Sequence, residues 1–237
     1  MSRFFAKQLD PLGERCRVIA LDLRGHGLSE KTEHGHTVPE YAADLRAFLD
    51  ALALREAVLV GWSMGAFVIW EYVKQFGTDG LAGTVIVDES ASDFAWDGWP
   101  HGIITPQMLR DLNEGVQSGR AELIQHVVSL MFKHDPAPED VAWMAEEMAR
   151  PPAGVASSIL LDQSLRDYRE DLAAVTVPSL VVFGADEKLL PVAAGVHLVE
   201  HLPNARLVVC DGSSHCPFLE EPELFNQTLL EFVESLA

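Results

Sequence analysis

The fold is decided by one stretch of the chain, Ala57-Val58-Leu59-Val60-Gly61-Trp62-Ser63-Met64-Gly65. Its first four residues form a short, fully apolar run, which is typical of a strand covered on both faces. A helical pattern runs from Met64 to Phe76, and Gly77 is a typical residue just beyond the end of a helix. The stretch therefore predicts a strand, a sharp turn and a helix, with a serine at the turn.

A serine in this position fits the G-x-S-x-G motif of nucleophilic serines, which requires a strand before it and a helix after it. The serine sits on a tight turn with a strained backbone, where residues two positions away crowd its Cβ, and we expect glycine at Gly61 and Gly65 to remove the clash. The turn would project Ser63 Oγ beyond the strand and leave the backbone N–H of Met64 available for a developing oxyanion. The alternative is a glycine-rich turn with an incidental serine, which the strand–helix context disfavours.

Short apolar runs alternate with amphipathic segments on both sides of this stretch, which indicates parallel strands joined by crossover helices. The expected strands are 17–22, 57–60, 84–87, 178–183 and 205–209, and the expected helices include 64–76, 191–201 and 222–235. The capping box Thr37-Val38-Pro39-Glu40 predicts the start of another helix. We therefore expect an α/β fold with a mostly parallel sheet flanked by helices.

Between about residues 90 and 175 the alternation stops, because helical patterns occur there without a convincing strand. We interpret residues 90–175 as a helical cap inserted into a core formed by residues 1–89 and 176–237. Trp96 and Trp99 of this cap, together with Trp62, are candidate substrate-binding residues. The alternative for all three indoles is ordinary core packing.

A serine hydroxyl is a poor nucleophile until a base takes its proton. His215 is the candidate base, because it lies on the loop Gly212-Ser213-Ser214-His215 after the last expected strand, unlike the other histidines. The segment Phe183–Pro191 places two adjacent carboxylates, Asp186 and Glu187, after the preceding strand. Either could orient the imidazole, and both give the chain order serine, acid, histidine.

The amino-acid composition limits the classes of partner that the protein is expected to bind. The net charge is −19, from 36 acidic and 17 basic residues, so the surface repels nucleic acids and anionic membranes. We expect neither a signal peptide nor a membrane span near the N-terminus. The three cysteines are interpreted as reduced thiols of a cytoplasmic protein.

Taken together, these motifs resemble the α/β-hydrolase superfamily, in particular its esterase and non-haem haloperoxidase (perhydrolase) branch. The resemblance covers nearly the whole chain and is carried by four segments, Asp22–Ser29, Gly61–Gly65, Gly184–Pro191 and Gly212–His215. It implies Glu187 as the acid, although the family mostly has aspartate there. Asp186 is the close rival, and Asp88 matches an alternative acid position of some relatives.

The resemblance also reveals a departure at the front of the chain. Relatives have further strands before the segment 16–22, and a loop after one of them supplies a second oxyanion donor. We expect this chain to be N-terminally truncated relative to that pattern, unless strand 17–22 pairs directly with strand 57–60. Loss of one oxyanion donor lowers turnover by about 10²–10³-fold in studied enzymes.

One pattern suggests a metal. His197-Leu198-Val199-Glu200-His201 spells H-x-x-E-H, and both histidines would share one helix face. Because a packing helix is needed between the last two strands in any case, we favour that interpretation and expect no metal.

The sequence thus predicts two-step acyl transfer on a small-molecule ester or lactone, without metal or organic cofactor. Ser63 would attack, His215 would shuttle the proton, and perhydrolysis is a side activity implied by the resemblance alone. The rival hypothesis is a non-catalytic or weakly active ligand-binding protein on the same fold. The oligomeric state and the natural substrate are left open.

Overall fold

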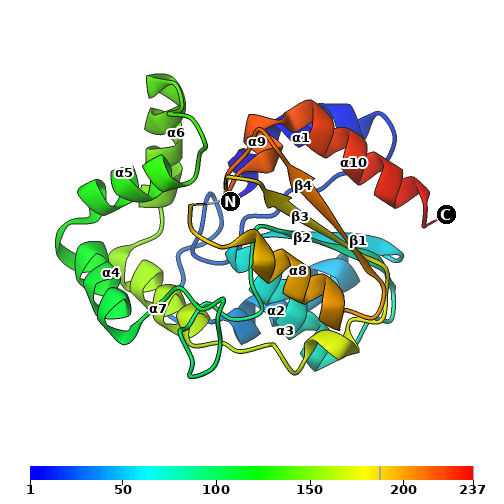
Figure 1. Ribbon diagram of the computed structural model, residues 1–237, viewed down its shortest axis with the longest axis horizontal. Helices are drawn as coiled ribbons and strands as arrows, with labels where there is room; N and C mark the ends of the chain where they lie inside the picture. Colours follow the sequence, from blue (N-terminus) through cyan, green and yellow to red (C-terminus); the bar gives the residue numbers. More distant parts are fainter. Residues whose placement is uncertain (187, 237) are drawn as a thin grey trace.

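The computed structural model describes residues 1–186 and 188–236. Its centre is a four-stranded parallel sheet in the order β1-β2-β3-β4 (Figure 1). The strands are β1 Ala57–Trp62, β2 Leu81–Val87, β3 Ser179–Gly184 and β4 Ala205–Cys210. Four of the five expected strands are therefore confirmed, each within a few residues of its expected bounds.

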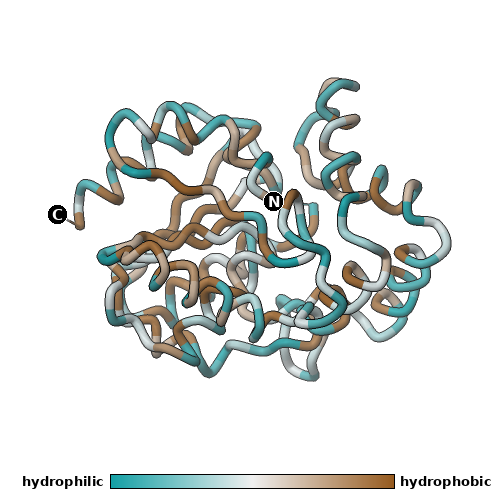
Figure 2. Tube along the Cα trace, turned by 180° about the vertical axis from the view of Figure 1, so that it is seen from behind, coloured by the Kyte–Doolittle hydropathy of each residue, from teal (hydrophilic) through white to brown (hydrophobic). Residues whose placement is uncertain are grey.

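Helices cover both faces of the sheet (Figure 1). One face carries α2 Val38–Ala51, α3 Met64–Phe76 and α8 Val192–His201, and the other carries α1 Ala6–Gly13, α9 Pro217–Glu220 and α10 Pro222–Glu234. Two short 3₁₀ helices complete the core, η1 Ser2–Phe5 and η2 Leu172–Ala174. Neighbouring strand residues point to opposite faces, so Ile86 belongs to the cluster under α3 and Val85 to the cluster under α10. Both faces need apolar side chains, which explains the hydrophobic stretches along the strands (Figure 2).

The segment between β2 and β3 is helical, as expected. It contains α4 Pro106–Ser118, α5 Arg120–Leu130, α6 Pro138–Ala149 and α7 Ala153–Ser164, which project from one end of the sheet (Figure 1). The only pairing recorded there among the described residues is an isolated bridge between Phe94 and Ile104. The division into core and cap stays an interpretation of this arrangement.

The expected strand 17–22 is wrong. No strand is assigned between α1 and α2 in the described part of the chain, and no backbone hydrogen bond of residues 17–21 is found there. A strand requires a paired neighbour, and β1 pairs with β2 alone. The alternative that residues 17–22 pair directly with β1 is therefore wrong as well. Apolar side chains on both segments are accordingly left partly open to solvent: Ile19 is 41% exposed, and Val60 of β1 is 38% exposed.

The capping box at the start of α2 is confirmed. Thr37 is the N-cap, and its side chain accepts a hydrogen bond of 3.4 Å from the backbone N–H of Glu40. None of the helices in residues 1–186 and 188–236 combines the length and the apolar character that a bilayer span requires.

Candidate active site

Ser63 occupies the turn between β1 and α3, in a backbone conformation that non-glycine residues rarely adopt. Its φ is 51° and its ψ is −124°. The turn is held by two hydrogen bonds, from Ser63 N–H to Val87 O (3.1 Å) and from Ala66 N–H to Ser63 O (2.8 Å). Strain of this kind persists only where surrounding structure enforces it, and it is concentrated at functional sites.

The two flanking glycines differ in their steric role. A Cβ on Gly61 would lie 2.5 Å from the carbonyl carbon and oxygen of Gly65, so a side chain is impossible without a shift of backbone. A Cβ on Gly65 would meet nothing within 4 Å. Glycine is therefore required at Gly61, although the close contact is with the backbone of Gly65 and not with the Ser63 Cβ, and no such requirement is seen at Gly65.

Met64 is the first residue of α3, where backbone N–H groups have no partner within the helix. No acceptor for its N–H is found among the described residues. The N–H stands at the positive end of the helix dipole, directly beside Ser63. It is available to a negatively charged oxygen, as the sequence predicts.

His215 lies between β4 and α9, and it is only 5% exposed. The indole of Trp62 anchors its loop: Trp62 Nε1 donates a hydrogen bond of 2.8 Å to the backbone carbonyl of His215, and the two rings are 5.4 Å apart. Trp62 directly precedes Ser63 in the chain. The structure therefore places the histidine loop beside the serine turn.

The loop after β3 packs tightly against the same histidine loop. A Cβ on Gly184 would lie 2.1 Å from the carbonyl oxygen of Ser214, so only glycine fits. Two backbone hydrogen bonds also join the loops, from Ala185 N–H to Cys210 O (2.9 Å) and from Asp186 N–H to Ser213 O (3.1 Å). The loop expected to carry the acid is thus fixed next to the loop that carries the candidate base.

The three candidate acids have different surroundings. Glu187 lies outside the described residues. Asp186 has an exposed side chain. Asp88 is fully buried just after β2, has a φ of 44°, and accepts a hydrogen bond of 3.1 Å from the N–H of Gly184.

Two glutamates that the sequence analysis missed hold the histidine loop. Glu220 accepts hydrogen bonds from the backbone N–H of Ser214 through Oε2 (2.8 Å) and of Lys133 through Oε1 (2.7 Å). Glu221 accepts from Gly212 N–H (2.9 Å) and from the Ser213 hydroxyl (2.5 Å), both through Oε2. Glu220 therefore bridges the histidine loop and the segment between α5 and α6, whereas Glu221 acts within the loop.

A buried carboxyl pair, Glu89 and Asp93, follows β2 and was also missed. Burial, reinforced by the nearby Asp93 carboxyl, raises the pKa of Glu89 well above its usual range. Burial also raises the pKa of Asp93, against the opposing effect of hydrogen bonds from Glu89 and Gln163 and of the nearby His215 imidazole. Perturbed carboxyl groups near a candidate catalytic histidine are typical of functional sites.

The three candidate substrate-binding tryptophans lie in different surroundings. Trp62 packs against Phe4 and Phe218 beside the histidine loop, with ring centroids 5.3 and 5.0 Å away. Trp96 Nε1 donates a hydrogen bond of 2.9 Å to the hydroxyl of Ser92, and Trp99 Nε1 donates one of 2.8 Å to the backbone carbonyl of Ser92. The structure therefore does not gather the three into one wall, and a substrate-binding role stays a prediction for each.

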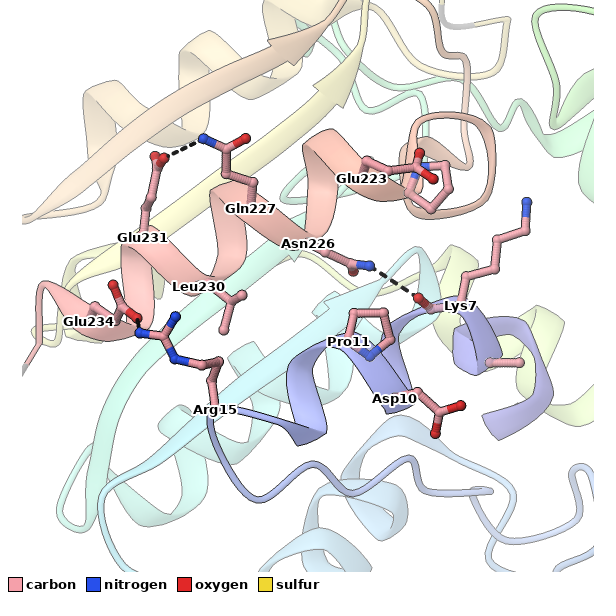
Figure 3. A pocket seen from close by; sticks show the side chains of 12 residues that line it. Lys7, Asp10, Pro11, Arg15, Glu223, Asn226, Gln227, Leu230, Glu231 and Glu234 are labelled. Atoms are coloured by element: carbon pink, nitrogen blue, oxygen red, sulfur yellow. Dashed lines mark hydrogen bonds and ion pairs between the residues drawn. The ribbon is translucent and has the colours of Figure 1, made fainter.

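A surface hollow lies apart from these residues, between α1 and α10 (Figure 3). Its polar side chains bond mainly to one another, as in the Arg15–Glu234 ion pair and the Gln227–Glu231 hydrogen bond of 2.9 Å. None of its lining residues is a candidate site residue.

Known proteins resemble this chain in sequence and in structure. Residues 2–228 match the family described as the alpha/beta hydrolase family. The chain is 32% identical to a non-heme chloroperoxidase of Streptomyces lividans, over 94% of this chain and 84% of the relative. It is 28% identical to a bifunctional esterase/perhydrolase of Acinetobacter calcoaceticus, over 97% of this chain and 86% of the relative. The structure of an esterase from Exiguobacterium antarcticum superposes with a TM-score of 0.94 at 23% identity, over 98% of this chain and 87% of that one.

Proposed function

The chain belongs to the alpha/beta hydrolase family, and we propose that it is a carboxylic ester hydrolase that works through Ser63 and His215. One observation carries the proposal: a serine at φ 51° directly follows the tryptophan that hydrogen-bonds the backbone of a buried histidine. Such a pair can activate a hydroxyl, because the imidazole takes the proton as the oxygen attacks. The relative named as an esterase/perhydrolase supports the assignment.

In the first half of the proposed reaction, His215 removes the proton of Ser63 Oγ, and the oxygen attacks the ester carbonyl carbon. The carbonyl oxygen becomes an oxyanion, and the N–H of Met64 donates a hydrogen bond to it. When the tetrahedral intermediate collapses, the bond to the leaving alkoxide breaks. His215 donates its proton to that oxygen, so an alcohol leaves and an acyl-Ser63 ester remains.

In the second half, His215 removes a proton from water, and the hydroxide oxygen attacks the acyl carbonyl. Collapse of the second intermediate releases the carboxylic acid and returns the proton to Ser63. A lactone would follow the same steps, with both products in one molecule. Hydrogen peroxide in place of water would give a peracid, and the perhydrolase relative supports that second activity.

The charged form of His215 needs a carboxylate to orient and stabilise it. We assign this role to Glu187, because the loop that contains it is hydrogen-bonded to the histidine loop at Asp186. Asp88 is the alternative, since it is buried and bonded to the same loop at Gly184. The exposed side chain of Asp186 makes it the weakest candidate.

The experiment that tests the function compares hydrolysis of a short p-nitrophenyl ester by the wild-type chain and by the Ser63→Ala variant. Ser129→Ala, an exposed position on α5, is the matched control. We expect Ser63→Ala to lose turnover and fluorophosphonate labelling, and Ser129→Ala to retain both. Equal turnover by all three proteins would instead favour a ligand-binding protein on the hydrolase fold.

A further inference from the structure

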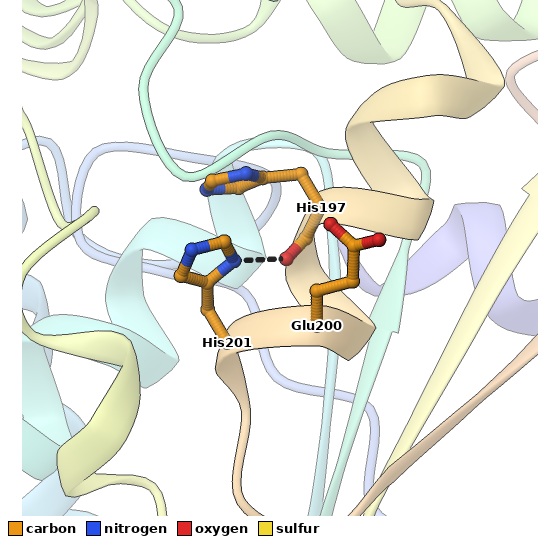
Figure 4. Close-up of side chains that lie close together, drawn as sticks. All are labelled: His197, Glu200 and His201. Carbon is orange, nitrogen blue, oxygen red and sulfur yellow. Dashed lines mark hydrogen bonds between the residues drawn. The ribbon is translucent and has the colours of Figure 1, made fainter.

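Three side chains at the C-terminal end of α8, none of them assigned a role in the proposed reaction, converge on one another. The ligand atoms of His197, Glu200 and His201 lie within 4.8 Å of one another. Figure 4 shows the two imidazoles and the carboxylate on the same side of the helix. The convergence follows from their spacing, since residues three and four apart share one helix face.

One of the two imidazoles is oriented as a metal-ligating histidine usually is. Nδ1 of His201 donates a hydrogen bond of 2.8 Å to the carbonyl oxygen of His197, which fixes the proton on Nδ1 and leaves a lone pair on Nε2. The two rings stack with centroids 3.9 Å apart. His197 Nε2 is buried and has no hydrogen-bond partner in the described part of the chain, which is a costly state for a polar atom.

We infer that His197, Glu200 and His201 form a binding site for Zn²⁺. Two imidazole nitrogens and one carboxylate oxygen are a ligand set that zinc prefers, whereas Mg²⁺ and Ca²⁺ prefer oxygen alone. Zinc–ligand bonds of about 2.0–2.1 Å in a tetrahedron separate the ligand atoms by about 3.3 Å. The ligand atoms lie within 4.8 Å of one another, so the side chains must rotate, and the stacked imidazoles must turn out of their parallel arrangement, to reach that spacing. Water would complete the tetrahedron.

The surroundings of the site also favour a cation. The ligands lie on the last turn of α8, where the helix dipole is negative, and the chain has a net charge of −19. Arg169 lies nearby, since its guanidinium stacks on Trp99 at 5.0 Å from the ring centroid. Its positive charge is balanced by an ion pair with Asp167.

Zinc at this site would reinforce the contact between α8 and the segment after β2. The rings of Trp99 and His101 lie 4.8 and 5.6 Å from the ring of His197, so the loop that leads into the cap packs directly against a ligand. A metal that binds only the folded chain raises its stability. The role is structural and is independent of the proposed hydrolysis.

The test measures Zn²⁺ binding to the metal-free 237-residue chain by calorimetry, together with Tm in the presence and absence of Zn²⁺. We expect one Zn²⁺ per chain, a rise in Tm, and no rise with Mg²⁺. His201→Ala changes an exposed side chain and should fold, yet it should weaken binding by at least about tenfold. His126→Ala, an exposed histidine on α5, is the matched control and should bind as the wild type does.

Absence of binding to the wild type, or equal binding by wild type and His201→Ala, would overturn the site. His197→Asn and Glu200→Gln guard against a folding artefact. Each should weaken Zn²⁺ binding, and each should lower the Tm measured with Zn²⁺ by more than it lowers the Tm of the metal-free chain. Ester hydrolysis enters none of these readouts. A failure of the zinc site is thereby distinguished from a failure of the proposed activity.

Discussion

The indole Nε1 of Trp62 donates a hydrogen bond of 2.8 Å to the backbone carbonyl of His215, across 153 residues of sequence. Trp62 is the last residue of β1 and Ser63 the first residue of the turn, so one side chain links the candidate nucleophile to the loop of the candidate base. Trp62 was a candidate substrate-binding residue, with core packing as the alternative. Its observed bond fits a positioning role, which a variant can separate from substrate contact.

Trp62→Phe should keep an aromatic ring between Phe4 and Phe218 but lose the bond to the His215 carbonyl. A misplaced base slows proton transfer, so we expect kcat/KM for a p-nitrophenyl ester to fall about tenfold, mainly through kcat. Trp143→Phe is the control, because it also loses an indole hydrogen bond, to Asp140, but at a residue outside the candidate site. An equal loss in both variants would point to general destabilisation, which thermal melting would reveal.

Glu220→Gln and Glu221→Gln should differ although the residues are neighbours. Glu220 uses both oxygens, one for Ser214 N–H and one for Lys133 N–H, and a glutamine offers only one acceptor oxygen. We expect Glu220→Gln to lose about 1–3 kcal/mol of unfolding free energy and to lower kcat, because a buried N–H loses its acceptor. Glu221 uses only Oε2, so Glu221→Gln should remain close to wild type in both measurements. Indistinguishable variants would show that the link to Lys133 is unimportant.

The sequence was informative where structure is local. The turn at Ser63, the helix 64–76 and the cap at Thr37 each depend on a few adjacent residues, and all three elements are present. Strand 17–22 was wrong because a strand depends on a partner, and periodicity alone says nothing about pairing. The Glu220–Lys133 link spans 87 residues, so no local pattern could indicate it.

The same reasoning applies to the candidate site. The closeness of the His215 loop and the loop after β3 could be predicted from their places after strands, since parallel strands end at one edge of the sheet, and hydrogen bonds join the two loops. Their catalytic roles stay predictions. The Glu89–Asp93 pair was missed because charged residues four apart usually lie on a solvated surface. Only the packing of the segment after β2 buries both carboxyl groups.

That buried pair makes stability depend on pH. The folded-state pKa of Glu89 is raised by burial and by the Asp93 carboxyl, so the folded chain keeps a proton that the unfolded chain loses above about pH 4.5. Unfolding free energy should therefore fall as pH rises from that value toward the folded-state pKa. Glu89→Gln removes the titration, and its Tm should decline less over this range than that of the wild type. Parallel Tm–pH curves for the two proteins would contradict the assignment.

His26 should act at the acid end with the opposite sign. Burial lowers its pKa to about 4, against the effect of its hydrogen bond with the Arg24 carbonyl. The folded chain therefore binds fewer protons than the unfolded chain between about pH 6.5 and pH 4, and stability should fall as pH decreases through that window. His26→Gln should flatten this acid slope in thermal melts, while exposed His34→Gln should leave it unchanged.

Amide variants of the three carboxylates should identify the partner of His215. Glu187→Gln should lower kcat by about 10⁴-fold, because loss of the orienting carboxylate leaves the imidazole in the wrong tautomer. Asp186→Asn should retain kcat, since the side chain is exposed. Asp88→Asn should act mainly on Tm. The buried carboxylate accepts a hydrogen bond from the Gly184 N–H, whereas an asparagine amide at this position must also find acceptors for its own N–H groups. If Asp88→Asn abolished turnover at an unchanged Tm while Glu187→Gln stayed active, the acid would lie after β2, and the loop after β3 would serve only to position it.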